Sequence, residues 1–192
     1  PYVDINPNVW FPAVLSAEDM DGDGDLDLIA TQAFAFTALH WYENWTGPGA
    51  VVGRRYCSPA IANSTGVAGS VRARGSVATA DQELTLTATG LPPNVAGLFL
   101  VSPQAGLTHP VMGSQGALCL SGPIGRLSSG PPMNAGPDGT YTLALDLSAI
   151  PTPTGSTAAT PGETWCFQAW HRDAAAGQGT SNFTDAVAVM FQ

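Results

Sequence analysis

A strict alternation of apolar and polar side chains is the feature that most narrows the folds open to this chain. In Glu83–Thr89, the residues Leu84, Leu86 and Ala88 alternate with threonines, and Tyr141–Leu147 repeats the pattern. Successive side chains of a β-strand point to opposite faces, so each segment is typical of a strand with one buried face. Hardly any run shows the period of about 3.6 residues that marks an amphipathic helix.

Glycine and proline punctuate the chain between these segments. The 192 residues include 22 Gly and 16 Pro, a composition typical of short strands joined by turns. Further strands are predicted at Gly97–Ser102, Ala117–Ser121, Glu163–Arg172 and Asp185–Phe191. About six to eight antiparallel strands with this spacing pack as two sheets. We therefore predict an all-β chain in which residues 53–192 form an antiparallel β-sandwich.

Residues 19–27 form an acidic segment, Asp-Met-Asp-Gly-Asp-Gly-Asp-Leu-Asp, with aspartate at every second position. Ca²⁺ takes about six to eight oxygen ligands, and loops of the D-x-D-x-D-G type supply them from alternate side chains and one backbone carbonyl. Gly24 stands where such a loop turns sharply. The predicted calcium ligands are the side chains of Asp19, Asp21, Asp23 and Asp27 and the carbonyl oxygen of Asp25.

The acidic segment has two other interpretations. An EF-hand is excluded because position twelve, counted from Asp19, needs a bidentate Glu and is Ala30 here. A solvated acidic turn without metal is the simpler alternative. Five like charges this close repel one another, however, and the apolar Leu28 and Ile29 that follow indicate a loop that runs into a buried strand. We therefore expect bound Ca²⁺.

Charge and composition exclude several partners. The chain has six Arg, no Lys and 15 acidic residues, so its net charge is −9 and it lacks the basic stripe of a nucleic-acid binder. No apolar stretch reaches the roughly 20 residues that span a bilayer, and no signal peptide is recognisable. The composition, rich in Ser, Thr, Gly and Pro, and the calcium loop favour an extracellular or cell-surface location. Because the chain begins at Pro1, we expect a processed product or part of a longer protein.

Residues 1–52 combine the acidic segment with three predicted strands, at Val9–Phe11, Leu26–Thr31 and Ala38–Glu43. The acidic loop, the apolar Leu28–Ala30 and the closing Trp41–Asn44 resemble one repeat of the FG-GAP or VCBS family. The resemblance implies a small calcium-binding β-blade. A propeller needs several blades, and this chain carries one copy. We therefore expect the blade to be the end of a trimmed propeller or to pack on the second unit.

Residues 53–192 carry seven short motifs: Arg55–Cys57, Asn63–Gly66, Gly113–Leu120, Ile124–Arg126, Pro161–Trp165, Phe167–Trp170 and Ser181–Asp185. Together they resemble a C-terminal module of large secreted bacterial proteins whose function is unassigned. The resemblance implies a disulfide between Cys57 and Cys119, with Cys166 as the remaining thiol. Since Cys119 and Cys166 both lie in predicted strands, a Cys119–Cys166 pair is the alternative.

The motifs of several common enzyme classes are absent from the sequence. It contains no G-x-S-x-G elbow, no H-E-x-x-H and no C-x-x-C. The three histidines are His40, His109 and His171. Two of them stand beside tryptophans in predicted strands, where packing is the expected role. We expect that the protein is not an enzyme.

Asparagine and tryptophan each raise a hypothesis about glycans. Three N-x-S/T sequons predict glycosylation at Asn44, Asn63 and Asn182, and the alternative is that these Asn and Thr side chains serve turns. Five tryptophans could build a sugar-stacking platform, but packing is the expected role for most of them. They are Trp10, Trp41, Trp45, Trp165 and Trp170.

These features predict a non-catalytic, calcium-stabilised extracellular β-protein with a structural or adhesive role. A three-stranded blade leaves two strand edges, and strand edges pair readily with another chain. We expect a homo-oligomer, as a subunit of a surface or filamentous assembly, or attachment to a longer parent chain. The alternative is a carbohydrate-binding accessory module of a secreted enzyme, which coplanar exposed aromatic rings on one sheet face would favour.

Overall fold

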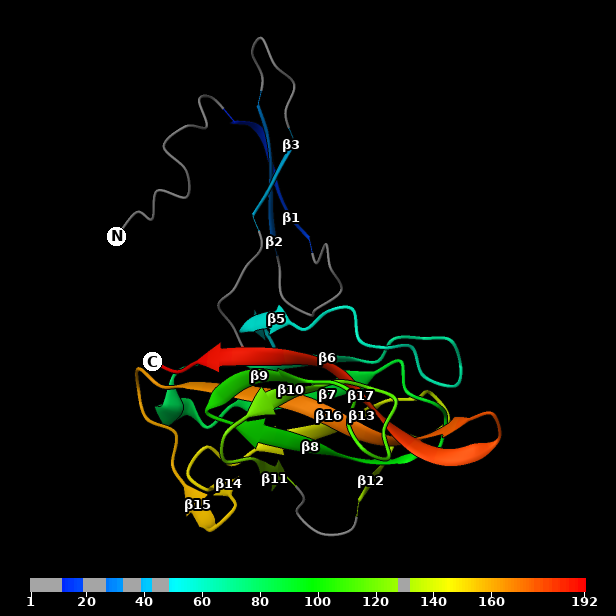
Figure 1. Cartoon of the computed structure of the whole chain (residues 1–192). Helices are drawn as coiled ribbons and strands as arrows, with labels where there is room; N and C mark the ends of the chain where they lie inside the picture. Colours follow the sequence, from blue (N-terminus) through cyan, green and yellow to red (C-terminus); the bar gives the residue numbers. More distant parts are fainter. Residues whose placement is uncertain (1–11, 19–26, 33–38, 43–48, 128–131) are drawn as a thin grey trace. The chain divides into compact units, whose positions relative to one another are not determined.

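The computed structural model describes residues 12–18, 27–32, 39–42, 49–127 and 132–192 (Figure 1). The chain divides into two compact units, Pro1–Ala50 and Val51–Gln192. The boundary predicted from the sequence is residue 52 instead. The difference is strand β4 (Val51–Val52), which pairs with β6 (Ser70–Gly75) and so belongs to the second unit.

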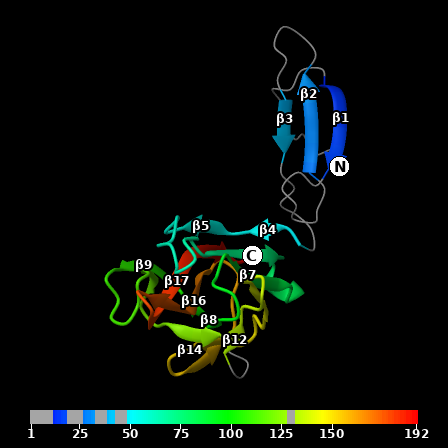
Figure 2. The ribbon, with the colours of Figure 1, turned by 90° about the vertical axis from the view of Figure 1, so that its right-hand side faces the viewer.

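The first unit contains a three-stranded antiparallel sheet in the order β1-β2-β3 (Figure 2). Its strands are β1 (Pro12–Glu18), β2 (Asp27–Gln32) and β3 (Leu39–Tyr42). Both ends of β2 and of β3 lie one residue from the predicted positions. The strand predicted at Val9–Phe11 falls outside the described residues. In the central strand β2, Ile29 pairs with Ser16 of β1 and with Trp41 of β3.

The second unit is a sandwich of two antiparallel sheets, which confirms the all-β prediction (Figure 1). A six-stranded sheet has the order β11-β8-β16-β17-β5, and β12 also pairs with β8. Its strands are β5 (Arg54–Tyr56), β8 (Ala96–Ser102), β11 (Gly125–Leu127), β12 (Met133–Asn134), β16 (Thr164–Ala175) and β17 (Gln178–Met190).

A four-stranded sheet, β13-β7-β6-β4, forms the other layer and includes β7 (Leu84–Thr89) and β13 (Tyr141–Leu145). Two separate hairpins pair β9 (Gln104–Thr108) with β10 (Leu118–Ser121) and β14 (Ile150–Thr152) with β15 (Gly155–Thr157). One 3-10 turn covers Thr79–Asp81. Among the described residues, no helix is long and apolar enough to cross a membrane.

The core of the second unit lies between the two sheets. The alternating Leu84, Leu86 and Ala88 of β7 are buried, as the sequence predicts, and Phe99 of β8 and Phe167 of β16 are fully buried. Full burial of a large apolar side chain contributes about 1.5–3 kcal/mol. Because side chains alternate along a strand, the residues between the core positions of β8 and β16 lie on the outer face of the six-stranded sheet.

Tyr141 connects β13 to the six-stranded sheet across the core. Its hydroxyl donates toward the carbonyl oxygens of Leu98 and Trp170, at 3.3 and 3.0 Å. Its ring meets that of Phe99 edge to face, with 5.1 Å between centroids. Gly97 leaves the space for this ring, since a Cβ atom there would stand 2.6 Å from Cε1 of Tyr141.

β16 and β17 form a long hairpin that extends past the neighbouring strands (Figure 1, orange to red). A two-residue turn joins them, and both of its residues, Ala176 and Gly177, have positive φ angles of 47° and 79°. Two-residue turns of this kind match the twist of paired strands. The hairpin is longer than predicted: the predicted strands end at Arg172 and begin again at Asp185, whereas β16 continues to Ala175 and β17 begins at Gln178.

Candidate functional site

The acidic segment joins β1 to β2, and these two strands are paired with each other at the ends that the segment connects. β1 ends at Glu18, β2 begins at Asp27, and these two residues are register partners. The other four predicted ligands, Asp19, Asp21, Asp23 and Asp25, fall outside the described residues. Within the described part of the chain, no three His, Cys, Asp or Glu side chains come together as a metal site would require. The calcium site stays a prediction for the turn of the β1–β2 hairpin.

A disulfide joins Cys57 to Cys119, whose Cα atoms lie 6.3 Å apart. This is the pair that the resemblance to the secreted module implies, and the alternative pairing of Cys119 with Cys166 is wrong. The bond links the end of β5 to β10. Cys166 is a buried free thiol, and burial raises its pKa.

Gln168 and Tyr56 hold β10 against the outer face of the six-stranded sheet. The Gln168 side chain accepts a hydrogen bond from the Cys119 N–H (2.9 Å) and donates to the carbonyls of Ala117 (3.0 Å) and Thr184 (2.7 Å). The Tyr56 hydroxyl donates to the Cys119 carbonyl (2.9 Å). Every polar atom of the fully buried Gln168 amide is therefore used to fasten β10 to the sheet.

The surroundings of two of the three predicted glycosylation sites, Asn182 and Asn63, are described by the structure. Asn182 is fully buried, and its amide nitrogen donates to the carbonyls of Ile61 and Ala62 and to the Asp173 carboxylate. Asn63 is 6% exposed, and its amide donates to the Gly90 carbonyl (2.7 Å). Both side-chain nitrogens therefore take part in hydrogen bonds within the fold, and glycosylation at Asn63 and Asn182 stays a prediction.

The sequon chemistry at Asn63 serves a turn. Its side-chain oxygen accepts hydrogen bonds from the backbone N–H and the hydroxyl of Thr65. This is the Asx-turn geometry that the sequence analysis weighs as the alternative. The third predicted glycosylation site, Asn44, falls outside the described residues.

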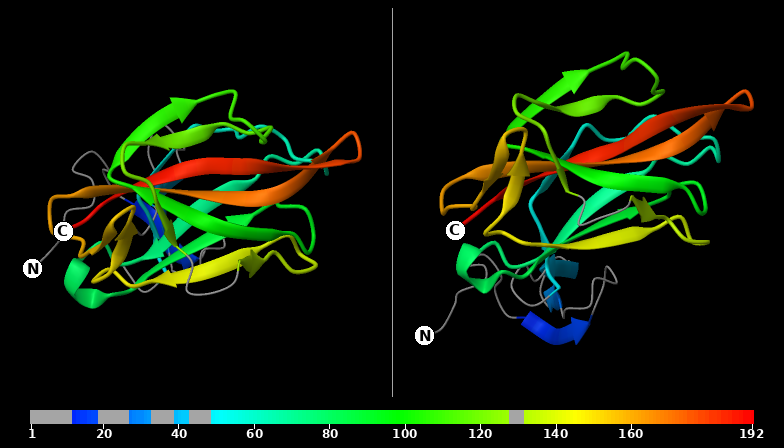
Figure 3. Two further views of the ribbon diagram at one scale, coloured as in Figure 1. Left: turned by 60° about the horizontal axis from the view of Figure 1, so that its bottom comes forward. Right: turned by 90° about the horizontal axis from the view of Figure 1, so that it is seen from below.

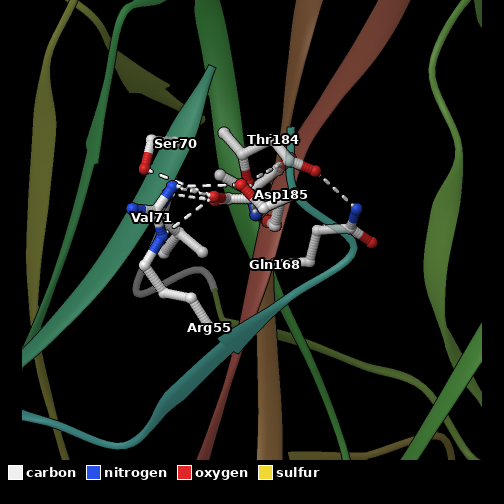
Figure 4. A network of polar contacts seen from close by, with 8 residues as sticks. Arg55, Ser70, Val71, Gln168, Thr184 and Asp185 are labelled. Carbon is white, nitrogen blue, oxygen red and sulfur yellow. Dashed lines mark hydrogen bonds and ion pairs between the residues drawn. The ribbon is translucent and has the colours of Figure 1, made fainter. Parts of the chain in front are cut away.

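Asp185 is the centre of a buried polar network between the two sheets (Figure 4). Its side chain is 1% exposed and accepts hydrogen bonds from the Val71 N–H (2.7 Å) and from Arg55 Nε (3.0 Å). Arg55 Nη2 pairs with the same carboxylate, and the Ser70 hydroxyl lies 3.5 Å away. Asp185 lies on β17 and Val71 on β6, so the network joins one sheet to the other. No pattern in the sequence predicts this network.

The side chains of His171, Trp165 and Trp170 take part in packing. His171 is fully buried, and its Nδ1 donates to the Arg172 carbonyl (2.9 Å), while Nε2 has no partner among the described atoms. Burial lowers the His171 pKa. Trp165 is 5% exposed and its indole N–H donates to the Glu163 carboxylate. The Arg172 guanidinium stands 5.3 Å from the Trp170 ring centroid.

Comparisons of the chain with protein-family models, with curated proteins and with solved structures find no match. The two resemblances drawn from sequence motifs therefore stay predictions.

Proposed function

We propose that this chain is a non-catalytic, extracellular β-protein with a structural or adhesive role, in which calcium stabilises the first unit. The observation that supports this proposal most is the β1–β2 hairpin. Its paired ends, Glu18 and Asp27, are joined by a segment with four further aspartates. Uncompensated, these like charges oppose the pairing of the strand ends. A Ca²⁺ ion bound in the turn would offset two charges and keep the hairpin closed.

The proposed mode of action is assembly through strand edges. β1 and β3 are the outer strands of a three-stranded sheet. Outer strands carry backbone groups that can pair with a further strand, and a sheet this small gains stability from doing so. The partner would be a second copy of the chain or the rest of a longer parent protein, as expected for an FG-GAP or VCBS-like blade.

The alternative, a carbohydrate-binding accessory module, draws little support from the described aromatic side chains. Trp165 is buried, and Trp170 is half-buried with Arg172 over its ring. In residues 49–127 and 132–192, the exposed large apolar side chains include no aromatic residue; they are Ile61, Val67, Leu107, Met112 and Met190.

Hydrogen exchange of the whole chain, with and without EDTA, tests the calcium proposal. Chelation should speed exchange in residues 12–18, 27–32 and 39–42 while the sandwich strands stay protected. Asp23→Asn should reproduce this pattern in the presence of Ca²⁺. A matched control is Asp138→Asn, since Asp138 is exposed in a turn of the second unit and should change nothing. Equal exchange with and without EDTA would contradict the proposal.

Light scattering across a range of protein concentrations tests assembly. We expect a mass above that of the 19.7 kDa chain, rising with concentration and falling when calcium is removed. A monodisperse monomer at micromolar concentration, with the first unit still protected from exchange, would contradict strand-edge assembly without touching the calcium proposal.

A further inference from the structure

An apolar pocket of about 440 Å³ lies on the outer face of the six-stranded sheet. Its lining comes from β8, β10, β11, β16, β17 and the turn before β11; the residues are Leu98, Leu100, Leu118, Ile124, Arg126, Trp170 and Phe183. The register explains the grouping, because Leu98 pairs with Trp170 across β8 and β16, and Arg126 of β11 pairs with Leu100. Pockets that hold small molecules in proteins have volumes of about 300–1,000 Å³.

The β9–β10 hairpin contributes Leu118 of β10 to the lining of this pocket. Figure 3 shows it beside the six-stranded sheet, on the side away from β7 and β13. The hairpin is fixed in place by the disulfide at Cys119 and by the Gln168 amide. The connection between β9 and β10 is also tied down, since Gln115 N–H and the Ser114 hydroxyl donate to the Ser181 carbonyl at 2.9 and 3.0 Å. The pocket is therefore preformed.

The side chains that line the pocket can donate hydrogen bonds but cannot accept them. Six of its seven side chains are carbon-rich, and their only polar atom is the indole nitrogen of Trp170. The seventh, Arg126, is exposed and makes no hydrogen bond or ion pair with any described residue. Indole and guanidinium groups only donate hydrogen bonds, so the lining side chains offer donors and a positive charge but no acceptor. The Asp146 carboxylate shares a neighbouring hollow with Arg126, and its nearest described partner is Ser148.

We propose that this pocket binds a small amphiphile with an apolar chain and one carboxylate group. The apolar part would occupy the space between Leu98, Leu100 and Phe183, and the carboxylate would accept hydrogen bonds from Arg126. A carboxylate is an acceptor without donors, so it complements a site that has donors without acceptors. A sugar fits less well, because each of its hydroxyl groups also donates and would find no side-chain acceptor in the lining.

Titration calorimetry of the whole chain with decanoate, below its micelle concentration, tests this proposal. We expect saturable binding at one site per chain, and weaker binding of decanol, which keeps the alkyl chain but lacks the charge. Arg126→Gln should weaken decanoate binding by about tenfold or more, as the loss of a charged hydrogen bond does. The same variant should leave decanol binding unchanged.

Two further variants make the result decisive. Arg72→Gln removes an exposed arginine from β6, on the other sheet, and should leave decanoate binding intact. Leu98→Trp should fill the pocket and abolish binding of both compounds, with the circular dichroism of each variant recorded to show that it folds. The proposal is overturned if decanoate does not bind saturably, if Arg126→Gln binds it as well as the parent chain, or if Arg72→Gln loses as much. None of these outcomes depends on calcium in the first unit.

Discussion

The two units of this chain differ in what is conspicuous about them: a sequence motif in the first unit and stabilising contacts in the second. The first unit carries a conspicuous motif, five aspartates at two-residue spacing, on a sheet whose strands have seven, six and four residues. The second unit carries no such motif, but it has a continuous apolar core, a disulfide and an ion pair whose carboxylate is buried. The most conspicuous sequence motif and the residues that stabilise the larger fold therefore lie in different parts of this chain. The experiments below test whether the two units also respond to different perturbations.

Breaking the disulfide should have the largest effect, and it should fall on the second unit. The bond closes a loop across a sequence separation of 62 residues, which corresponds to about 4 kcal/mol in the chain-entropy treatment. Cys57→Ser combined with Cys119→Ser should lower the urea midpoint of the sandwich. Cys166→Ser, which removes the thiol outside the disulfide, is the control. A double variant as stable as the parent would show that the core alone suffices.

Removing Arg55 should also destabilise the second unit. Arg55→Met leaves the Asp185 carboxylate buried with only the Val71 N–H and a long contact to Ser70. Loss of one partner of a buried pair costs about 3–5 kcal/mol, and the value here should be near the lower end because the Arg55 side chain is 40% exposed. Arg54→Met, at an exposed neighbouring position of β5, is the control. Urea unfolding measures both, and equal stability of the two variants would contradict the structural role of the pair.

Calcium should reverse this pattern and act on the first unit alone. At a free Ca²⁺ concentration of a hundred times the dissociation constant, one site adds about 2.7 kcal/mol to the stability of the unit that binds it. In calorimetry, increasing Ca²⁺ should raise the unfolding temperature of the first unit only. Asp21→Ala should abolish this shift. If calcium instead raised the unfolding temperature of the sandwich, the proposal that it stabilises only the first unit would be contradicted.

Acid should affect the second unit through His171, with a smaller effect. Burial lowers the pKa of His171, although the nearby Asp173 opposes this, so the folded chain binds fewer protons there than the unfolded chain. The free energy of unfolding should therefore fall as the pH drops below about 6.5, and the loss should level off below the folded pKa.

His171→Gln should remove this dependence, and the matching change at the exposed His109 should not. The lowered pKa of Asp173 does not confuse the result, since that carboxyl group protonates only below about pH 4. Unfolding curves between pH 5 and 8 that are identical for the parent chain and His171→Gln would contradict the prediction.

Strands with a sustained alternation of apolar and polar residues are predicted well from the sequence. Strands with a short alternation, and turns without a common signal, are predicted poorly. β7 and β13 follow from period-two alternation, and the burial of Leu84 and Leu86 confirms it. β6 is not among the predicted strands, because its alternation is short: the apolar Val71 and Ala73 are each followed by an arginine. The β16–β17 hairpin is longer than predicted because its turn residues, Ala176 and Gly177, follow no common hairpin signal.

The candidate sites were harder to predict because they depend on distant residues. Arg55 and Asp185 are 130 positions apart, and neither has a local feature that points to the other. The pocket lining likewise comes from six separate segments, which only the sheet order brings together. The sequons at Asn63 and Asn182 pose a different difficulty. An Asn close to a Thr suits a turn or a buried hydrogen-bond network as well as glycosylation, and the sequence does not show that both side chains are buried.

The position of the disulfide also has a mechanical consequence. Cys57 lies shortly after the start of the second unit, so a force that pulls on the chain from the first unit reaches this bond after β4 and β5. The load then passes directly to Cys119, and the intervening segment cannot be stretched while the bond is intact. A fully extended chain spans about 3.4 Å per residue. In single-molecule pulling, the oxidised unit should therefore lengthen by about 200 Å less than the reduced one, given the separation of 62 residues.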